Sequence, residues 1–199
     1  MLDTTTHDQP LASAQDLANY HARRERFYAT AAMLLTMAPD RLLLASARCF
    51  ARGGRAATEL AAALNDERRH GAEAEHELLF SGDAPVIDRR CHDPAAASRI
   101  EVSEQGMLEL APDIAAELRA LAILADRTAD AIEAGEMTEA ATLCELQARF
   151  LRHAGPCAGR LAADLAAAGA PFYAALGRSL HEQLDEDMRL LAAIDEAAT

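Results

Sequence analysis

Apolar residues recur at three- and four-residue intervals between Ile114 and Ile132, and most of the intervening positions are charged or small. This spacing places the apolar side chains on one face of an α-helix. Pro112 suits the first turn of a helix, and Asp113 suits the positive end of the helix macrodipole. Gly135 is a typical residue just beyond a helix C-terminus. The pattern therefore predicts an amphipathic helix that begins near Pro112 and ends at Gly135.

A second helix is predicted directly after Gly135. Thr138 is expected to cap it, and its apolar face consists of Leu143, Leu146 and Phe150. Arg152 and His153 then precede a Gly-Pro pair that includes Pro156, which is the usual order of a cationic last turn and a stop signal. We expect this helix to end before Pro156, with His153 as a cation at its C-terminus. A role of His153 in partner binding is the alternative.

The remaining chain also has mainly helical spacing. Residues 1–11 are polar and aperiodic, which is typical of a frayed terminus. The segment near residues 81–110 contains Gly82, Pro85 and Pro94 without a sustained apolar stripe, and we expect it to form one long loop. The expected helices cover Ser13 to Met37, Pro39 to the Gly53-Gly54 pair, Arg55 to Phe80 with a break near Asn65, residues 157–168, and Phe172 to Ala197 beyond Gly169 and Pro171.

Composition favours the same fold class. The chain has 199 residues, of which 51% are hydrophobic and 4% aromatic, and alanine is abundant. Alanine and leucine have high helix propensity, and a chain of this length can bury one sizeable core. We predict an all-α, single-domain bundle of about seven to nine helices over residues 12–199.

Charge and cysteine usage exclude several classes of partner. The net charge is −13, and a surface of this sign repels nucleic acid and anionic membranes. No apolar run reaches the ~20 residues that a membrane span needs. Arg23 and Arg24 precede a short apolar stretch, which we interpret as part of a helix and not as an export signal of this chain. The four cysteines lack metal-site spacing and favour a reducing compartment: Cys49, Cys91, Cys144 and Cys157.

Two clusters invite comparison with metal sites. Glu67-x-x-His70 and Glu73-x-x-His76 have the spacing of di-iron ligands, but such a site needs these units on two different helices. Cys91-His92-Asp93 lacks the second ligand pair of a structural zinc site. We predict no metal, no cofactor and no catalytic residue, and a helical metal-dependent oxidoreductase is the alternative from another functional class.

Asp113 and Glu117 carry like charges four residues apart, which costs about 0.2–0.5 kcal/mol in a helix. The macrodipole offsets much of this repulsion at a helix start. The alternative is that the two carboxylates await an arginine from a partner.

A series of motifs resembles the TorD/DmsD/NarJ family of molybdoenzyme chaperones. The series runs over about residues 20–190 and comprises FYATAAMLLTMAPDRLL, Glu75-His76-Glu77-Leu78-Leu79-Phe80-Ser81-Gly82, Ile114-Ala115-x-Glu117-Leu118, LAD at 124–126, GEMTEAATL, Phe150-Leu151-x-His153, Pro156, and Phe172-Tyr173-x-x-Leu176. Three positions depart from the family pattern. Pro112 and Asp113 stand where the family has Asp and His, Cys157 replaces a Trp, and His76 replaces a Tyr or Trp.

The resemblance implies a non-enzymatic cytoplasmic chaperone of TorD-like fold. It would bind the twin-arginine leader, or the apo-form, of the catalytic subunit of a molybdopterin-dependent oxidoreductase until the cofactor is inserted. A leader combines two arginines with an apolar helix-former, so its receptor needs an apolar groove beside acidic groups. The candidate client-binding residues are His76, Leu79, Phe80, Pro85, Pro112, Asp113, Glu117 and His153.

A NarJ-like assembly factor for a reductase subunit without an export signal is the other form of this hypothesis. The sequence does not specify the client, and it is compatible with a monomer or a domain-swapped dimer.

Overall fold

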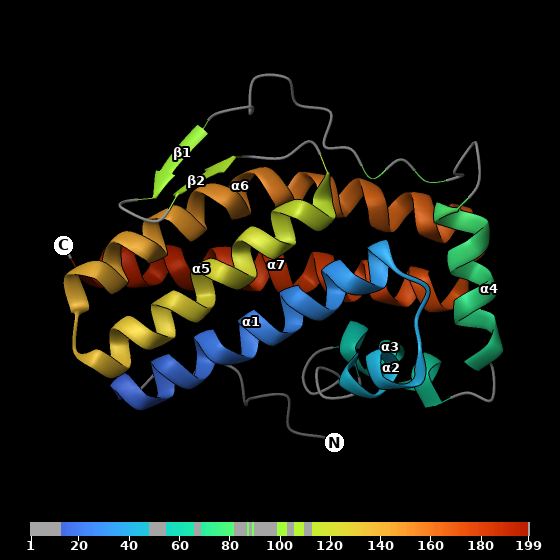
Figure 1. Ribbon diagram of the computed structural model, residues 1–199, viewed down its shortest axis with the longest axis horizontal. Coiled ribbons are helices and arrows are strands. Elements are labelled where there is room, and N and C mark those ends of the chain that lie inside the picture. The colour runs from blue at the N-terminus through green and yellow to red at the C-terminus, as the bar shows by residue number, and fades with distance from the viewer. Residues whose placement is uncertain are drawn as a thin grey trace, which may run out of the picture.

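The computed structural model describes residues 13–47, 55–65, 69–81, 87, 89, 99–102, 106–109 and 113–198. Its helices are α1 (Ala14–Thr36), α2 (Arg41–Ala47), α3 (Arg55–Asn65), α4 (Arg69–Phe80), α5 (Ile114–Ala134), α6 (Met137–Ala167) and α7 (Pro171–Ala198), and its strands are β1 (Arg99–Val102) and β2 (Gly106–Glu109). The described part of the chain is thus an all-α bundle with one small hairpin (Figure 1). This confirms the predicted fold class.

Four long helices form the body of the molecule. Helix α5 packs against α1 on one side and α6 on the other, and α6 packs in turn against α7. Helices α2, α3 and α4 lie together at one end, where α3 and α4 both contact α7 (Figure 1). Segments from the two halves of the sequence therefore build a common bundle, with α1 lying along α5.

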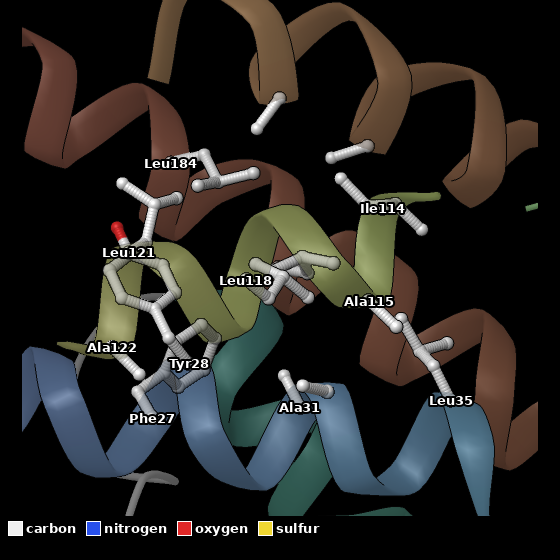
Figure 2. Packing of buried hydrophobic residues seen from close by; sticks show 14 of the residues in the cluster. Phe27, Tyr28, Ala31, Leu35, Ile114, Ala115, Leu118, Leu121, Ala122 and Leu184 are labelled. Carbon is white, nitrogen blue, oxygen red and sulfur yellow. The ribbon is translucent and has the colours of Figure 1, made fainter. Parts of the chain in front are cut away.

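The core is made mainly of leucine and alanine. Figure 2 shows the contact between α1 and α5, where Phe27 and Ala31 face Leu118 and Ala122. Alanines on both helices leave room for the few large rings, and Tyr28 is completely buried among them. Leu184 of α7 reaches the same cluster near Leu121 (Figure 2). The bundle is therefore packed through small residues, as its composition predicts.

Several predicted helix ends are confirmed. Ser13 caps α1 by accepting a hydrogen bond of 3.2 Å from the backbone N–H of Asp16. Gly135 ends α5 with a φ of 79°, and Gly169 follows α6 with a φ of 71°. Both glycines have left-handed backbones that disfavour any residue with a Cβ. The break near Asn65 is also present, because α3 ends at that residue.

The predicted bounds of the central hairpin need three corrections. Helix α5 begins at Ile114 with Asp113 as its N-cap, so Asp113 lies before the first turn. Thr138 lies inside α6, which begins at Met137 after Glu136, whose side chain makes no capping bond. Helix α6 does not stop before Pro156 but continues to Ala167.

The continuation past Pro156 has a physical cause. The apolar stripe of α6 extends beyond the proline through Ala158, Leu161 and Leu165, all of which are buried. A proline in a helix interior removes one intrahelical hydrogen bond, whereas ending the helix would expose this whole stripe. Burial therefore outweighs the local stop signal, and His153 lies in the middle of α6 instead of at its C-terminus.

The long segment between α4 and α5 contains regular structure that the sequence analysis did not predict. Strands β1 and β2 pair antiparallel, with Arg99 opposite Glu109 and Val102 opposite Gly106. The prediction of one long loop near residues 81–110 is thus wrong for residues 99–102 and 106–109. The predicted frayed terminus, residues 1–11, lies outside the described residues.

Candidate functional site

The end of α4 carries an aromatic cluster. The rings of His76 and Phe80 have centroids 5.2 Å apart, and the Phe80 ring meets that of Tyr173 on α7 edge-on at 5.2 Å. The hydroxyl of Tyr173 donates a hydrogen bond of 2.9 Å to the backbone carbonyl of Leu34 on α1. Leu79 is fully buried beside this cluster. These contacts fix the end of α4 against both α1 and α7.

Glu75 joins α4 to the start of α7. Its Oε2 accepts hydrogen bonds of 3.1 Å and 3.2 Å from the backbone N–H groups of Phe172 and Tyr173. These groups belong to the first turn of α7, where N–H groups have no intrahelical acceptor. A carboxylate from α4 thus caps α7, a role that periodicity alone does not reveal.

His76 is the most unusual member of the cluster. Only 5% of its surface is exposed, and within the described residues neither ring nitrogen has a hydrogen-bond partner. Burial lowers the pKa of His76, and the nearby positive charge of Arg89 lowers it further. Both effects disfavour the protonated imidazole. His76 is therefore a neutral ring at pH 7.

Arg89 joins this cluster to the start of α5. Its Nε lies 3.6 Å from Oδ2 of Asp113, and its Cζ lies 5.6 Å from the centre of the Phe80 ring. Its Nη1 donates a hydrogen bond to the backbone carbonyl of Leu35, at the end of α1. Asp113 also caps α5, because its Oδ1 accepts a hydrogen bond of 2.7 Å from the N–H of Ala115. One guanidinium thus links α1, α4 and α5.

Glu117 lies one turn further along α5 and is completely buried. Its Oε1 is 3.3 Å from Nδ1 of His153 on α6. The two like charges of this helix start therefore have separate partners within the chain, since Asp113 meets Arg89 and Glu117 meets His153. The sequence predicted the acidic pair but not the partner of either member.

Six of the eight predicted client-binding residues lie along one path through α4, α5 and α6. The path runs from the aromatic cluster through Arg89 and Asp113 to the buried pair on α5 and α6. The remaining two predicted residues, Pro85 and Pro112, lie outside the described residues. Arg89 itself was missed, because its segment shows no periodicity.

A second polar cluster, also missed, lies inside the bundle. Arg24 of α1 and Asp187 of α7 form a buried ion pair with an Nε–Oδ2 distance of 2.7 Å. Tyr20 donates a hydrogen bond of 2.6 Å to Asp187, and Tyr28 donates another to the same carboxylate. Arg24 also donates to Oε1 of Gln147 on α6. Asp187, with two tyrosine hydroxyls and one guanidinium around it, is therefore well compensated for its burial.

Arg24 also determines the state of His21. A guanidinium only donates, so Nδ1 of His21 accepts at 3.2 Å and the neutral ring carries its proton on Nε2. That Nε2 lies 3.9 Å from Sγ of Cys144. Burial and then Arg24 lower the pKa of His21 to about 3, and burial raises the pKa of Cys144. A neutral imidazole beside a protonated thiol does not form an activated nucleophile.

This internal cluster had one signal in the sequence. Arg24 falls on the apolar stripe of α1 between Tyr20 and Tyr28, and Asp187 falls on the stripe of α7 between Leu184 and Leu191. A charged residue at a core position needs an opposite charge nearby. The two positions could have been matched by that requirement.

Two parts of the metal-site motifs, Glu67 and the Cys91-His92-Asp93 cluster, lie outside the described residues. In α4, Glu73 is exposed whereas His76 is buried. Within the described residues, no group of three or more His, Cys, Asp or Glu side chains could hold a metal ion. The two cysteines of the described part, Cys144 and Cys157, form no disulfide, and Cys49 and Cys91 lie outside it.

Among the helices of the described residues, none is both long and apolar enough to cross a membrane. Comparison of the chain with family models, with curated proteins and with solved structures finds no match.

Proposed function

We propose that the chain is a cytoplasmic chaperone for a molybdopterin-dependent oxidoreductase. It binds the twin-arginine leader of the client's catalytic subunit, or another region of the apo-form, and holds it until the cofactor is inserted. The observation that carries this proposal is the juxtaposition of two family-like motifs. The end of α4, with His76 and Phe80, is joined to the start of α5, with Asp113, by Arg89, which contacts both the Phe80 ring and the Asp113 carboxylate.

The two motifs are far apart in the sequence. The whole segment between α4 and α5, which includes the hairpin of β1 and β2, separates Phe80 from Asp113. Their proximity is therefore a property of the fold and not of the local sequence. It supports a common binding surface to which both motifs contribute.

The chemistry of this region suits such a client. A leader presents cationic side chains next to an apolar segment, which needs acidic and apolar groups side by side. The Asp113 carboxylate is partly exposed, and Phe80 is half-buried. The net charge of −13 would speed the encounter with a cationic segment. Glu117 is buried, so we assign it to holding His153 and assign client contact to Asp113.

Calorimetry with a synthetic leader peptide tests the proposal. The peptide is a twin-arginine leader, with two consecutive arginines before an apolar helix-forming segment. We expect Asp113→Asn to weaken binding about fivefold to tenfold, because it removes a charge-assisted contact. Asp130→Asn, which changes an exposed carboxylate on the same helix, is the matched control and should leave the affinity unchanged.

A second peptide, in which both leader arginines are replaced by glutamine, should bind weakly to every variant. Equal affinity of the wild-type chain for both peptides, or no effect of Asp113→Asn, would contradict the proposed mode of binding. Absence of binding to both the leader and the apo-subunit would contradict the proposed function itself.

A further inference from the structure

The surroundings of Arg89 form a complete binding site for a guanidinium group. Asp113 on α5 supplies a carboxylate, Phe80 on α4 supplies an aromatic face, and Leu35 on α1 supplies a backbone carbonyl. Carboxylates, ring faces and carbonyl oxygens are the three groups that recognise arginine in proteins. We call this arrangement the arginine cradle.

We propose that Arg89 is an internal occupant of the arginine cradle, and that an arginine side chain of the client polypeptide displaces it on binding. The inference rests on the proposed function and names the place in the chain where a client arginine is recognised. It also makes Arg89 an autoinhibitory contact, because the cradle is filled until a client arrives.

The ion pair of Arg89 with Asp113 is weak enough to be exchanged. It is 28% exposed, its Asp113 partner is 36% exposed, and the contact between them is a single approach of 3.6 Å. Ion pairs at such partly exposed positions are weak, because water screens them and the long side chain loses freedom. A second guanidinium with the same contacts can therefore compete.

The main chain around Arg89 is anchored independently of its side chain. The carbonyl of Arg89 accepts a hydrogen bond of 3.0 Å from the N–H of Ile114, and the N–H of Ile87 donates at 3.1 Å to the carbonyl of Leu79. The segment is thus attached to both α4 and α5 by its backbone. Removal of the side chain should leave this attachment intact.

The cradle favours arginine over lysine. A guanidinium is planar, so it can lie over the Phe80 ring while its N–H groups reach Asp113 and the carbonyl of Leu35 at the same time. The ammonium of lysine is a compact charge without a flat face, and it cannot make all three contacts from one position. Selectivity for arginine is therefore the distinguishing property of this site.

The variant Arg89→Ala tests the inference without any client. N-acetyl-argininamide is titrated into the variant, with N-acetyl-lysinamide as the comparison, and binding is followed by nuclear magnetic resonance of the Phe80 and His76 rings. We expect saturable binding of the arginine probe that is at least about fivefold tighter than to the wild-type chain and tighter than that of the lysine probe. Adding Asp113→Asn to the variant should abolish it.

Arg127→Ala is the matched control. Arg127 is also an arginine paired with a carboxylate, with its Nη2 3.0 Å from Oε1 of Glu139. Its removal uncovers a carboxylate outside the cradle, so this variant should gain no affinity for the arginine probe. Circular dichroism checks the fold of each variant.

Arg89→Gln repeats the titration with a neutral side chain that can still donate a hydrogen bond to the backbone carbonyl of Leu35. This variant should bind the probe more weakly than Arg89→Ala does.

The titration of His76 gives an independent readout. Burial lowers the pKa of His76 most, the charge of Arg89 lowers it further, and the charge of Glu77 raises it. The pKa of His76 should therefore rise in Arg89→Ala and fall again when N-acetyl-argininamide fills the cradle. A merely structural role of Arg89 predicts no reversal by the probe.

The outcomes separate this inference from the proposed function. Equal binding of the arginine and lysine probes, or equal binding to Arg89→Ala and wild type, would overturn the inference. A leader peptide whose affinity is unchanged by both Arg89→Ala and Asp113→Asn would overturn it and leave the chaperone proposal standing. Saturable binding of the arginine probe without binding of any leader or apo-subunit would support the cradle and overturn the chaperone proposal.

Discussion

At the scale of single residues, the buried cluster around Asp187 holds three helices together. Arg24 comes from α1, Gln147 from α6 and Asp187 from α7, so the cluster fixes how these helices lie relative to each other. Desolvation of two charges is expensive, and a buried pair contributes little net stability when it is intact. Removal of only one member of the pair is strongly destabilising, because the other charge then stays buried without compensation.

We therefore expect Asp187→Asn to lower the free energy of unfolding by about 3–5 kcal/mol. The substitution keeps the shape of the side chain but leaves Arg24 without its counter-charge. Asp185→Asn, on an exposed position of the same helix, should change the value by less than about 0.5 kcal/mol. Urea unfolding followed by circular dichroism measures both, and similar values for the two variants would contradict the assigned role.

The double variant Arg24→Met with Asp187→Leu sharpens this prediction. It removes both charges and fills the space with apolar side chains. We expect it to be more stable than Asp187→Asn alone, because no charge is left buried and unpaired. A double variant less stable than Asp187→Asn would show that the hydrogen bonds of the cluster matter more than its charge balance.

His21 makes stability depend on pH. Its pKa is about 3 in the folded chain, whereas an unfolded histidine has a pKa of about 6.5. Between these values the unfolded state binds the additional proton, so the free energy of unfolding falls as pH falls from about 6.5 towards 3, and above about 6.5 this contribution is constant. The slope is about 1.4 kcal/mol per pH unit.

The variant His21→Asn isolates this effect. Asparagine keeps an acceptor for Arg24 but cannot be protonated in this range. Between about pH 5 and pH 6, the stability of the wild-type chain should fall with decreasing pH more steeply than that of His21→Asn, by about 1.4 kcal/mol per unit. Urea unfolding at the two pH values measures this, and parallel slopes would contradict it.

At the scale of elements, glycines set the distance between α6 and α7. A Cβ on Gly177 would lie 2.9 Å from the Cα of Ala162, which is too close for unmoved backbones. A Cβ on Gly159 of α6 would come no closer than 3.5 Å to the ring of His181, which is an ordinary van der Waals contact. Both glycines lie in helix interiors, so they differ in their surroundings and not in their local backbone.

Substitution by alanine should therefore have opposite effects at these two positions. Gly159→Ala should raise the free energy of unfolding by about 0.5–1 kcal/mol through helix propensity. Gly177→Ala should lower it by about 1–3 kcal/mol, because α6 and α7 must move apart. Thermal unfolding of the two variants compares them directly, and a change of the same sign would contradict the close packing of α6 on α7.

The elements also show what the sequence could predict. Ser13, Asn65, Gly135 and Gly169 act through local backbone chemistry, and the helix ends predicted from them are present. Pro156 is also a local signal, one that favours the end of a helix. Burial of the rest of α6 opposes this signal, and that burial depends on tertiary contacts that the local sequence does not contain. Local signals therefore succeed where no tertiary contact opposes them.

The candidate site was predictable only in part for a related reason. Periodicity and the resemblance identified Phe80, Asp113 and Glu117, because each lies in or beside a regular helix. Arg89 and the partner of Glu117 come from segments distant in sequence, and a pattern along the chain does not state which helices meet. The pairing of Arg24 with Asp187 was missed for the same reason.

At the scale of the whole molecule, the contacts form a closed circuit. Helix α1 packs on α5, α5 on α6, and α6 on α7, while the Arg24–Asp187 pair joins α7 back to α1. At the small end, α4 is attached to α7 through Glu75 and Tyr173, α3 is attached to α7 through the pair of Glu59 and Arg178, and α2 packs on α1. No helix of the four-helix body can therefore leave without breaking contacts in its neighbours.

This circuit predicts cooperative unfolding. The chain has no tryptophan, and Tyr20, Tyr28 and Tyr173 report on the contacts of α1 and α7. Urea transitions followed by tyrosine emission and by far-ultraviolet circular dichroism should have the same midpoint. An earlier transition in circular dichroism alone would show that α2, α3 and α4 unfold as a separate unit.

The long separation between Arg24 and Asp187 also has a consequence for biosynthesis. These residues are 163 positions apart, and a ribosome adds about 5–20 residues per second. Arg24 is thus added to the chain roughly 8–30 seconds before Asp187. During this interval the face of α1 that carries Tyr20, Arg24 and Tyr28 lacks the Asp187 carboxylate, so the nascent chain must complete α7 before α1 reaches its final place.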